Sequence, residues 1–410
     1  MERQKAILVS AQTGQWDVEH SLSELRALCD TDGIDVAAEV VQTMERLNPA
    51  TYIGSGKALE VQQLAEQTEA DLVIVDDDLS GVQTRNLEEM FGIPVIDRTV
   101  LILDIFARNA VTAEGKLQVE LAQLKYRLPR LLGLGNSLSQ QGGGIGTRGP
   151  GETKLETDRR HIRSRIRALS EKLEEVEKRR EVTRRSRKKN GIPIVALVGY
   201  TNVGKSSLLN ALTGSDILAE NKLFATLDPT ARRLPVANMQ NVILIDTVGF
   251  VSRLPHHLVE AFKSTLAEAQ YADLILLVAD ASSEHWEEEI EVTRNVLDEL
   301  KCGDTPVIQV FNKCDLVEST DLLPGIPVSA ETGEGLERLL NEISVKLSER
   351  IVHAMLLFPF SDVGKVALLR DRGNIVSEHW REDGLMVQAT VDLTIWPRYE
   401  KYQVVPELDN

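Results

Sequence analysis

One stretch decides the fold of this chain: Gly199-Tyr200-Thr201-Asn202-Val203-Gly204-Lys205-Ser206. It fits the pattern G-x-x-x-x-G-K-[ST], in which a glycine-rich loop wraps phosphate oxygens with backbone N–H groups. The apolar run Ile194–Val198 precedes it and the helical pattern Ser207–Leu212 follows it. A strand, a glycine-rich loop and a helix in this order predict a phosphate-binding loop, because the helix N-terminus adds partial positive charge.

The phosphate-binding loop and a second segment predict a site for phosphate and Mg²⁺. Lys205 is expected to reach the β- and γ-phosphates and the Ser206 hydroxyl to bind Mg²⁺. Asp246-Thr247-Val248-Gly249 follows the apolar run Val242–Ile245. There, Asp246 would hold the Mg²⁺ ion directly or through water, and the Gly249 amide would meet the γ-phosphate.

A third segment selects the base. Asn312-Lys313-Cys314-Asp315 follows the apolar run Val307–Phe311, and Ser329-Ala330 follows Ile326–Val328. The Asp315 carboxylate can accept two hydrogen bonds from guanine, from N1–H and from the exocyclic amine. Adenine offers no such pair, and each bond to a charged group is worth about 1.5–3 kcal/mol. The backbone N–H at Ser329-Ala330 would meet guanine O6.

These motifs resemble the signature motifs of translation-factor-like and Ras-like GTPases. In that resemblance Leu223–Thr230 is the switch segment, Thr226 binds Mg²⁺, and Thr230 is the other candidate. The catalytic set is then Lys205, Thr226 and Gly249, and the metal set is Ser206, Thr226 and Asp246. The expected GTP contacts are residues 199–206 with Ser207, Phe224, Ala225, Thr226, Asp246, Thr247, Val248, Gly249, Asn312, Lys313, Asp315, Ser329 and Ala330.

One departure from the pattern concerns the attacking water. Phe250 follows Gly249, where many such GTPases carry a water-orienting glutamine. Phenylalanine cannot polarise water, so we expect slow intrinsic turnover that a partner accelerates. The alternative is that another side chain positions the water unaided. Asn202 is a candidate for binding a monovalent cation beside the phosphates, or it only supports the loop.

Apolar runs and helical patterns divide the rest of the chain. We expect an α/β fold of several domains: a small N-terminal α/β domain (1–112), a coiled-coil-like helical hairpin (113–190), a doubly wound GTPase domain (191–350) and a small α+β domain (351–410). The N-terminal domain should contain a parallel sheet, since strands alternate with helices there. In the last domain a strand at Met355–Phe358, a helix at Asp362–Arg370 and a hairpin around Glu382-Asp383-Gly384 are expected.

Two leucine-rich seams predict the hairpin. Apolar residues recur at spacings of four and three from Leu117 to Leu131 and again from Ile162 to Val176. Between them, Gly133–Gly151 is rich in glycine and contains Pro150, so we expect no regular helix there.

Charge separates the hairpin from the rest. The chain has a net charge of -17, yet residues 115–190 hold 20 Lys and Arg against 9 Asp and Glu. A local basic surface is suited to a phosphate backbone, although a charged helix that serves solubility is the alternative. Three scattered cysteines predict neither disulfides nor a zinc site, and therefore a reducing, cytoplasmic setting. No apolar run is long enough to insert into a membrane.

The sequence from Gly142 to Glu152 (GGGIGTRGPGE), with Leu155-Glu156 and Asp158-Arg159-Arg160, resembles the signature of HflX-type GTPases. This resemblance covers nearly the whole chain and implies binding to the 50S subunit and splitting or rescue of stalled or idle 70S ribosomes under stress. It also implies a monomer when free, in the cytoplasm and partly at ribosomes or the membrane surface. The expected RNA contacts are Gly142, Gly143, Gly144, Arg148, Arg159, Arg160 and Arg163, with Arg165 and Arg167 also gripping the backbone.

A second glycine motif, Gly54-Ser55-Gly56-Lys57, precedes the helical pattern Ala58–Glu66. It is a candidate phosphate cradle, and the resemblance associates this domain with ATP and RNA remodelling. A structural turn that caps the helix is the preferred interpretation.

Other functions remain open from the sequence. A ribosome-assembly GTPase would carry the same motifs. A signalling switch that binds a protein target is disfavoured by the basic hairpin and by the lack of a lipidation motif.

Overall fold

The structure is a computed structural model of the chain. It describes residues 3–14, 16–140, 150–189, 192–215, 223–224, 227, 229–236, 242–253, 258, 268–348, 351–372, 374–393 and 395–404. Its contacts form two compact units. The first comprises Met1–Glu175 with Glu220–Asp228 and Val248–Thr265, and the second comprises Val176–Ala219, Pro229–Thr247 and Leu266–Asn410. Among the described residues, no helix is both long and apolar enough to cross a membrane.

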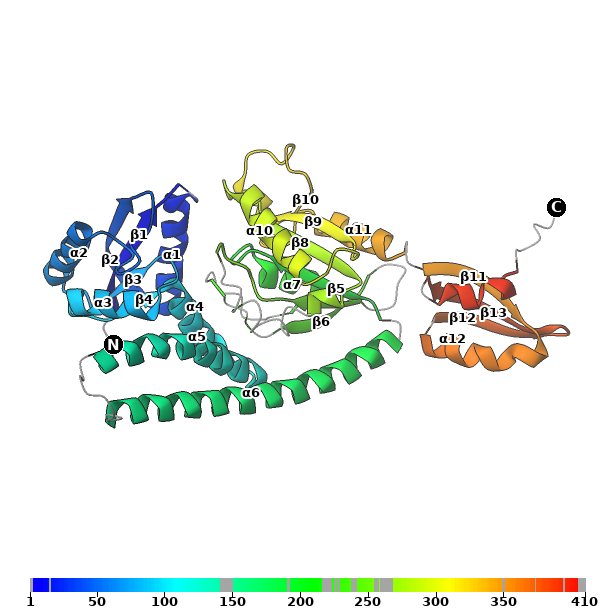
Figure 1. Ribbon diagram of the computed structural model, residues 1–410. Coiled ribbons are helices and arrows are strands. Elements are labelled where there is room, and N and C mark those ends of the chain that lie inside the picture. The colour runs from blue at the N-terminus through cyan, green and yellow to red at the C-terminus, as the bar shows by residue number, and fades with distance from the viewer. Residues whose placement is uncertain are drawn as a thin grey trace. The chain divides into compact units, whose positions relative to one another are not determined.

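The first unit is built on a four-stranded parallel sheet, as predicted (Figure 1). Its strands are β1 (Gln4–Gln12), β2 (Ile34–Thr43), β3 (Leu72–Val75) and β4 (Val95–Asp97), in the order β2-β1-β3-β4. Its helices are α1 (Val18–Asp32), α2 (Ser55–Thr68), α3 (Gly81–Phe91) and α4 (Arg98–Asn109). Helix α4 was not expected, because a nearly continuous apolar run hides its periodicity; it buries seven residues, including Leu101, Ile105 and Phe106.

Two long helices follow and run in opposite directions side by side (Figure 1). These are α5 (Ala113–Gln140) and α6 (Pro150–Lys189), joined by a bidentate pair in which Arg165 donates to Glu120 at 2.6 and 2.9 Å. The expectation that Gly133–Gly151 is not helical was wrong at both ends. Helix α5 continues through its glycines, each of which costs only about 1 kcal/mol, and Pro150 stands at the first position of α6, where proline is tolerated.

The second unit contains a six-stranded sheet with the order β10-β9-β8-β5-β7-β6. Its strands are β5 (Ile194–Gly199), β6 (Thr230–Leu234), β7 (Val242–Asp246), β8 (Leu274–Asp280), β9 (Val307–Asn312) and β10 (Ile326–Pro327). All neighbours are parallel except β6, which runs antiparallel to β7. Helices α7 (Lys205–Thr213), α10 (Trp286–Glu299) and α11 (Leu336–Ser348) accompany the sheet. This is the expected doubly wound arrangement, in which ligands bind at the carboxyl ends of the strands.

The C-terminal segment of this unit forms a three-stranded antiparallel sheet. Strands β11 (Ile351–Phe358) and β12 (Asn374–Arg381) flank β13 (Gly384–Asp392), so the predicted hairpin is confirmed. The predicted helix at Asp362–Arg370 consists of two parts: the 3-10 helix η2 (Phe360–Lys365) and the α-helix α12 (Val366–Arg372). Two short 3-10 helices, η3 (Trp396–Arg398) and η4 (Glu400–Tyr402), end the described chain.

Candidate active site

The phosphate-binding loop joins β5 to α7, and two of its glycines are sterically required. A Cβ on Gly199 would lie 2.1 Å from the carbonyl oxygen of Val278 on β8. Gly204 has φ +85° and is the N-cap of α7, and a Cβ there would lie 2.3 Å from Asn312 Nδ2. Any larger residue at either position would displace a neighbouring strand or the base-recognition segment.

Lys205 is the first residue of α7 and only 7% exposed. Its Nζ donates to the carbonyl oxygens of Tyr200, at 2.6 Å, and Gly199, at 3.1 Å. Burial lowers the pKa of Lys205 to about 8, and the charge of Asp246 opposes that shift. A buried ammonium with few anionic neighbours is thus placed inside the loop that would receive phosphate.

Ser206 and Asp246 converge from α7 and β7. The Ser206 hydroxyl donates to Asp246 Oδ2 at 2.6 Å, and Asp246 is 2% exposed. Mg²⁺ prefers oxygen ligands and is held in such sites by one or two protein oxygens together with substrate phosphates. The Ser206 hydroxyl oxygen and the Asp246 carboxylate are therefore the groups that would hold a Mg²⁺ ion here.

The base-recognition segment begins at the end of β9. Asn312 Nδ2 donates to the carbonyl oxygen of Val203 at 2.8 Å, and Asn312 Oδ1 accepts from the Ala330 amide at 3.0 Å. This one amide side chain joins the phosphate loop to the loop after β10. Asp315 lies in the short helix η1 (Cys314–Leu316) and is exposed, and its role in guanine recognition stays a prediction.

A residue that the sequence analysis missed supports this segment. Asp280 ends β8, and its Oδ2 accepts from Lys313 Nζ at 2.6 Å. Lys313 has φ +62°, a strained conformation for a residue other than glycine. The ion pair with Asp280 fixes the position of its side chain. An acidic residue directly after an apolar strand is a signal that could have identified Asp280.

The other expected contact residues are divided between the two units and the part of the chain that is not described. In the second unit, Thr201 has a buried hydroxyl with no hydrogen-bond partner within the described part of the chain, and Thr247 Oγ1 donates to the carbonyl of Leu197 at 2.7 Å. Phe224 belongs to the first unit, where its ring meets Phe106 edge-on at 4.6 Å. The predicted contacts Ala225 and Thr226 lie outside the described residues, as do Gly142, Gly143, Gly144 and Arg148.

Val248, Gly249 and Phe250 also belong to the first unit. The Phe250 side chain is 2% exposed, so it packs as a core residue. Their roles toward nucleotide stay predictions.

The second glycine motif is a helix cap. Gly54 is the N-cap of α2, and its amide donates to Gln42 Oε1 at 2.8 Å. Lys57 pairs with Glu60 at 2.7 Å. The motif therefore lies at the N-terminus of α2, as expected, and both the interpretation as a structural turn and ATP binding there stay predictions.

Three family models match the chain: a GTP-binding GTPase N-terminal region at residues 19–107, a GTP-binding GTPase middle region at 109–187, and a 50S ribosome-binding GTPase at 194–313. The GTPase HflX of Caldanaerobacter subterraneus is 52% identical over 98% of this chain and 94% of its own length. The GTPase HflX of Escherichia coli is 41% identical over 98% of this chain and 96% of its own. A crystal structure of SsGBP with GDP is 27% identical over 84% of this chain and 99% of its own, with a TM-score of 0.48.

The relatives extend over nearly the full length, and the phosphate, metal and base motifs meet at one edge of the second sheet. The chain is therefore a GTP-hydrolysing enzyme that belongs to the HflX family.

Proposed function

We propose that this GTPase acts in the cytoplasm on the large ribosomal subunit, and that it splits or rescues stalled or idle 70S ribosomes. The matching model for residues 194–313 is described as a 50S ribosome-binding GTPase, which supports the ribosome as partner. The proposal depends most on one observation, the arginine face of α6.

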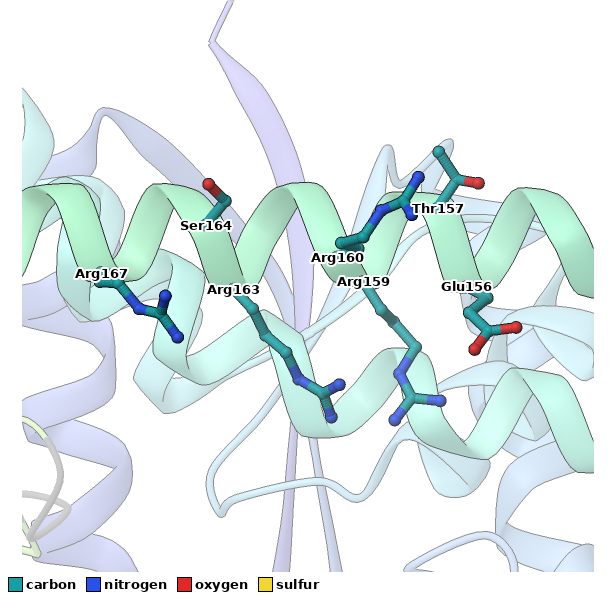
Figure 2. A pocket seen from close by; sticks show the side chains of 7 residues that line it. All are labelled: Glu156, Thr157, Arg159, Arg160, Arg163, Ser164 and Arg167. Atoms are coloured by element: carbon teal, nitrogen blue, oxygen red, sulfur yellow. The ribbon is translucent and has the colours of Figure 1, made fainter.

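That face is the set of side chains that line a surface hollow of about 660 Å³: Glu156, Thr157, Arg159, Arg160, Arg163, Ser164 and Arg167. Figure 2 shows Arg159, Arg163 and Arg167 reaching from the same side of the helix, as spacings of four predict. Arg160, Arg163 and Arg167 are exposed, and within the described chain no ion pair is recorded for them. Guanidinium groups of this kind bind RNA phosphates bidentately or stack on bases.

Arg165 differs from these arginines because Glu120 of α5 holds it in a bidentate pair that joins the two helices. Its side chain is still half exposed, and its contact with RNA stays a prediction.

The chemistry follows from the active site. Mg²⁺ would neutralise charge that develops on the β- and γ-phosphates. Lys205 would bind the same oxygens, Ser206 and Asp246 would hold the ion, and Thr226 and Gly249 would close over the γ-phosphate. With Phe250 buried, no group on the adjacent residue orients water, so the ribosome is the proposed source of acceleration.

The test is GTP hydrolysis by the purified chain, alone and with 50S, 30S or 70S particles. We expect stimulation by 50S and 70S particles, and loss of that stimulation in Arg163→Glu with basal turnover retained. Arg46→Glu makes the same charge change at another exposed arginine and is the matched control.

Splitting is measured separately, by light scattering of 70S particles with GTP. Stimulation by precursor 50S particles and none by 70S would favour assembly instead. No stimulation by any particle would reject the ribosomal proposal and leave the GTPase assignment standing.

A further inference from the structure

At the carboxyl edge of the first sheet, the chain connections leave β1 and β3 in opposite directions. From β1 the chain passes to β2 on one side and returns through α2 to β3 on the other. In open parallel sheets, ligands bind at this point, between the two strands whose connections go opposite ways. Ser10 near the end of β1 and Asp76 directly after β3 mark it, and both are 0% exposed.

A guanidinium group already occupies this position. Arg253, from the segment that follows Phe250, donates to Ser21 Oγ at 3.3 Å and pairs with Asp76 at 3.5 Å and with Asp77 at 3.1 Å. Its Cζ lies 3.9 Å from the centre of the Trp16 ring. We call Trp16, Ser21, Asp76 and Asp77 the Arg253 site; they belong to the first unit, as does Arg253.

The chemistry of these four residues matches a guanidinium better than any other cation. The group is planar, so it can lie on an indole face while its N–H groups point in plane toward carboxylates. An ammonium has no flat face and is more strongly hydrated. Burial raises the pKa of the Asp77 carboxyl, and the charge of Arg253 opposes that shift.

The backbone shows that the side chain holds its own segment in place. Arg253 has φ +54°, a left-handed conformation that costs a residue other than glycine about 1–2 kcal/mol. Beside it, the Ser252 amide donates to Glu24 Oε1 at 3.2 Å, and the Ser252 carbonyl accepts from Arg98 at 3.3 Å. Contacts made by the guanidinium therefore offset backbone strain in a segment that begins just after Gly249.

We propose that the Arg253 site is a guanidinium-binding site of the first unit, that Arg253 is its ligand within the chain, and that guanidinium compounds from outside the chain compete for it. An external ligand that displaces the Arg253 side chain partly releases residues 251–253, which follow the γ-phosphate motif and keep the contacts of Ser252 with Glu24 and Arg98. This inference does not depend on a ribosomal partner.

The experiment uses the full chain with Arg253→Ala, which removes the occupant. Ethylguanidinium is the probe, because it replaces the atoms that the substitution deletes. We expect saturable binding, seen by calorimetry and by a change in tryptophan fluorescence. It should be at least tenfold tighter than in the unsubstituted chain, where the tethered Arg253 competes for the same contacts. Ethylammonium should bind at least tenfold more weakly than ethylguanidinium.

Two second substitutions in this background separate contact from general charge. Asp77→Asn should abolish the binding, whereas Asp78→Asn, which removes the next carboxylate without a guanidinium contact, should retain it. Trp16→Phe should remove the fluorescence change.

Binding that is equal in the unsubstituted chain, absent in Arg253→Ala, or insensitive to Asp77→Asn would overturn the proposal. Retained GDP binding and an unchanged circular dichroism spectrum verify that each variant is folded. In the unsubstituted chain, saturating ethylguanidinium should accelerate amide hydrogen exchange at residues 251–253; unchanged exchange at saturation would contradict the release.

Discussion

Asn312 Nδ2 donates to the carbonyl oxygen of Val203 at 2.8 Å, which connects the base-recognition segment directly to the phosphate-binding loop. These residues are 109 positions apart. The same side chain accepts from the Ala330 amide, so three loops meet at one buried group. Asn312 therefore holds these loops together, and its expected contact with the nucleotide stays a prediction.

Asn312→Ala should lower the affinity for GTP and GDP together, by tenfold or more. The buried Val203 carbonyl and the half-buried Ala330 amide would lose their partner, at about 1–3 kcal/mol for a buried group. Calorimetric titration with both nucleotides measures this. Gln309→Ala, on the same strand, removes a side chain that contacts Arg294 and should leave both affinities unchanged. If Asn312→Ala bound GTP and GDP as tightly as the unsubstituted chain does, the loops would keep their geometry without this side chain.

Asp315→Asn should reverse base preference from guanine toward xanthine, because an amide donates where a carboxylate accepts. Asp315 is exposed, so folding should not suffer. Competition between GTP and xanthosine triphosphate measures the ratio of the two affinities, which we expect to change tenfold or more. Asp321→Asn, in the following loop and bonded to Ser319, is the control. Unaltered selectivity in Asp315→Asn would remove this carboxylate from base recognition.

Nucleotide affinity should fall as pH rises above about 8. The pKa of Lys205 is lowered to about 8 in the nucleotide-free chain, and phosphate binds the protonated form and raises that pKa. Below pH 7 Lys205 is protonated in both the free and the nucleotide-bound chain, so this lysine does not make the affinity for GDP depend on pH. Above pH 8 binding must take up a proton, and affinity falls up to tenfold per pH unit. Titration at pH 8.5 in two buffers of different ionisation enthalpy measures the uptake; none would contradict the assignment.

Breaking the buried ionic network of the first unit should strongly destabilise that unit. Arg98 is 3% exposed and pairs with Glu24 and Asp76, whose side chains are 5% and 0% exposed. Glu24→Ala leaves part of a buried charge unpaired and should destabilise the unit by about 3–5 kcal/mol. Glu39→Ala breaks a surface pair with Arg26 and should cost at most about 1 kcal/mol. Hydrogen exchange of β1 amides compares the two, and equal losses would exclude a special role for the buried pair.

Much of the active site could be predicted from the sequence, because its chemistry is local. The phosphate loop, the Asp246 motif and the base segment are each short and follow an apolar strand. Parallel strands end at a common edge, so local patterns fix which side chains meet. The leucine seams likewise predicted α5 and α6, since helical periodicity shows in one segment alone.

Tertiary structure alone decided the remaining features. Helix α4 and the pair of Asp280 with Lys313 both depend on neighbours distant in sequence. The largest such feature is the assignment of Glu220–Asp228 and Val248–Thr265 to the first unit, where Arg253 meets Asp76 and Asp77. Periodicity and spacing report which face of a segment is buried. They do not report which other segment covers that face, because the contact energy belongs to pairs of residues that only the folded chain brings together.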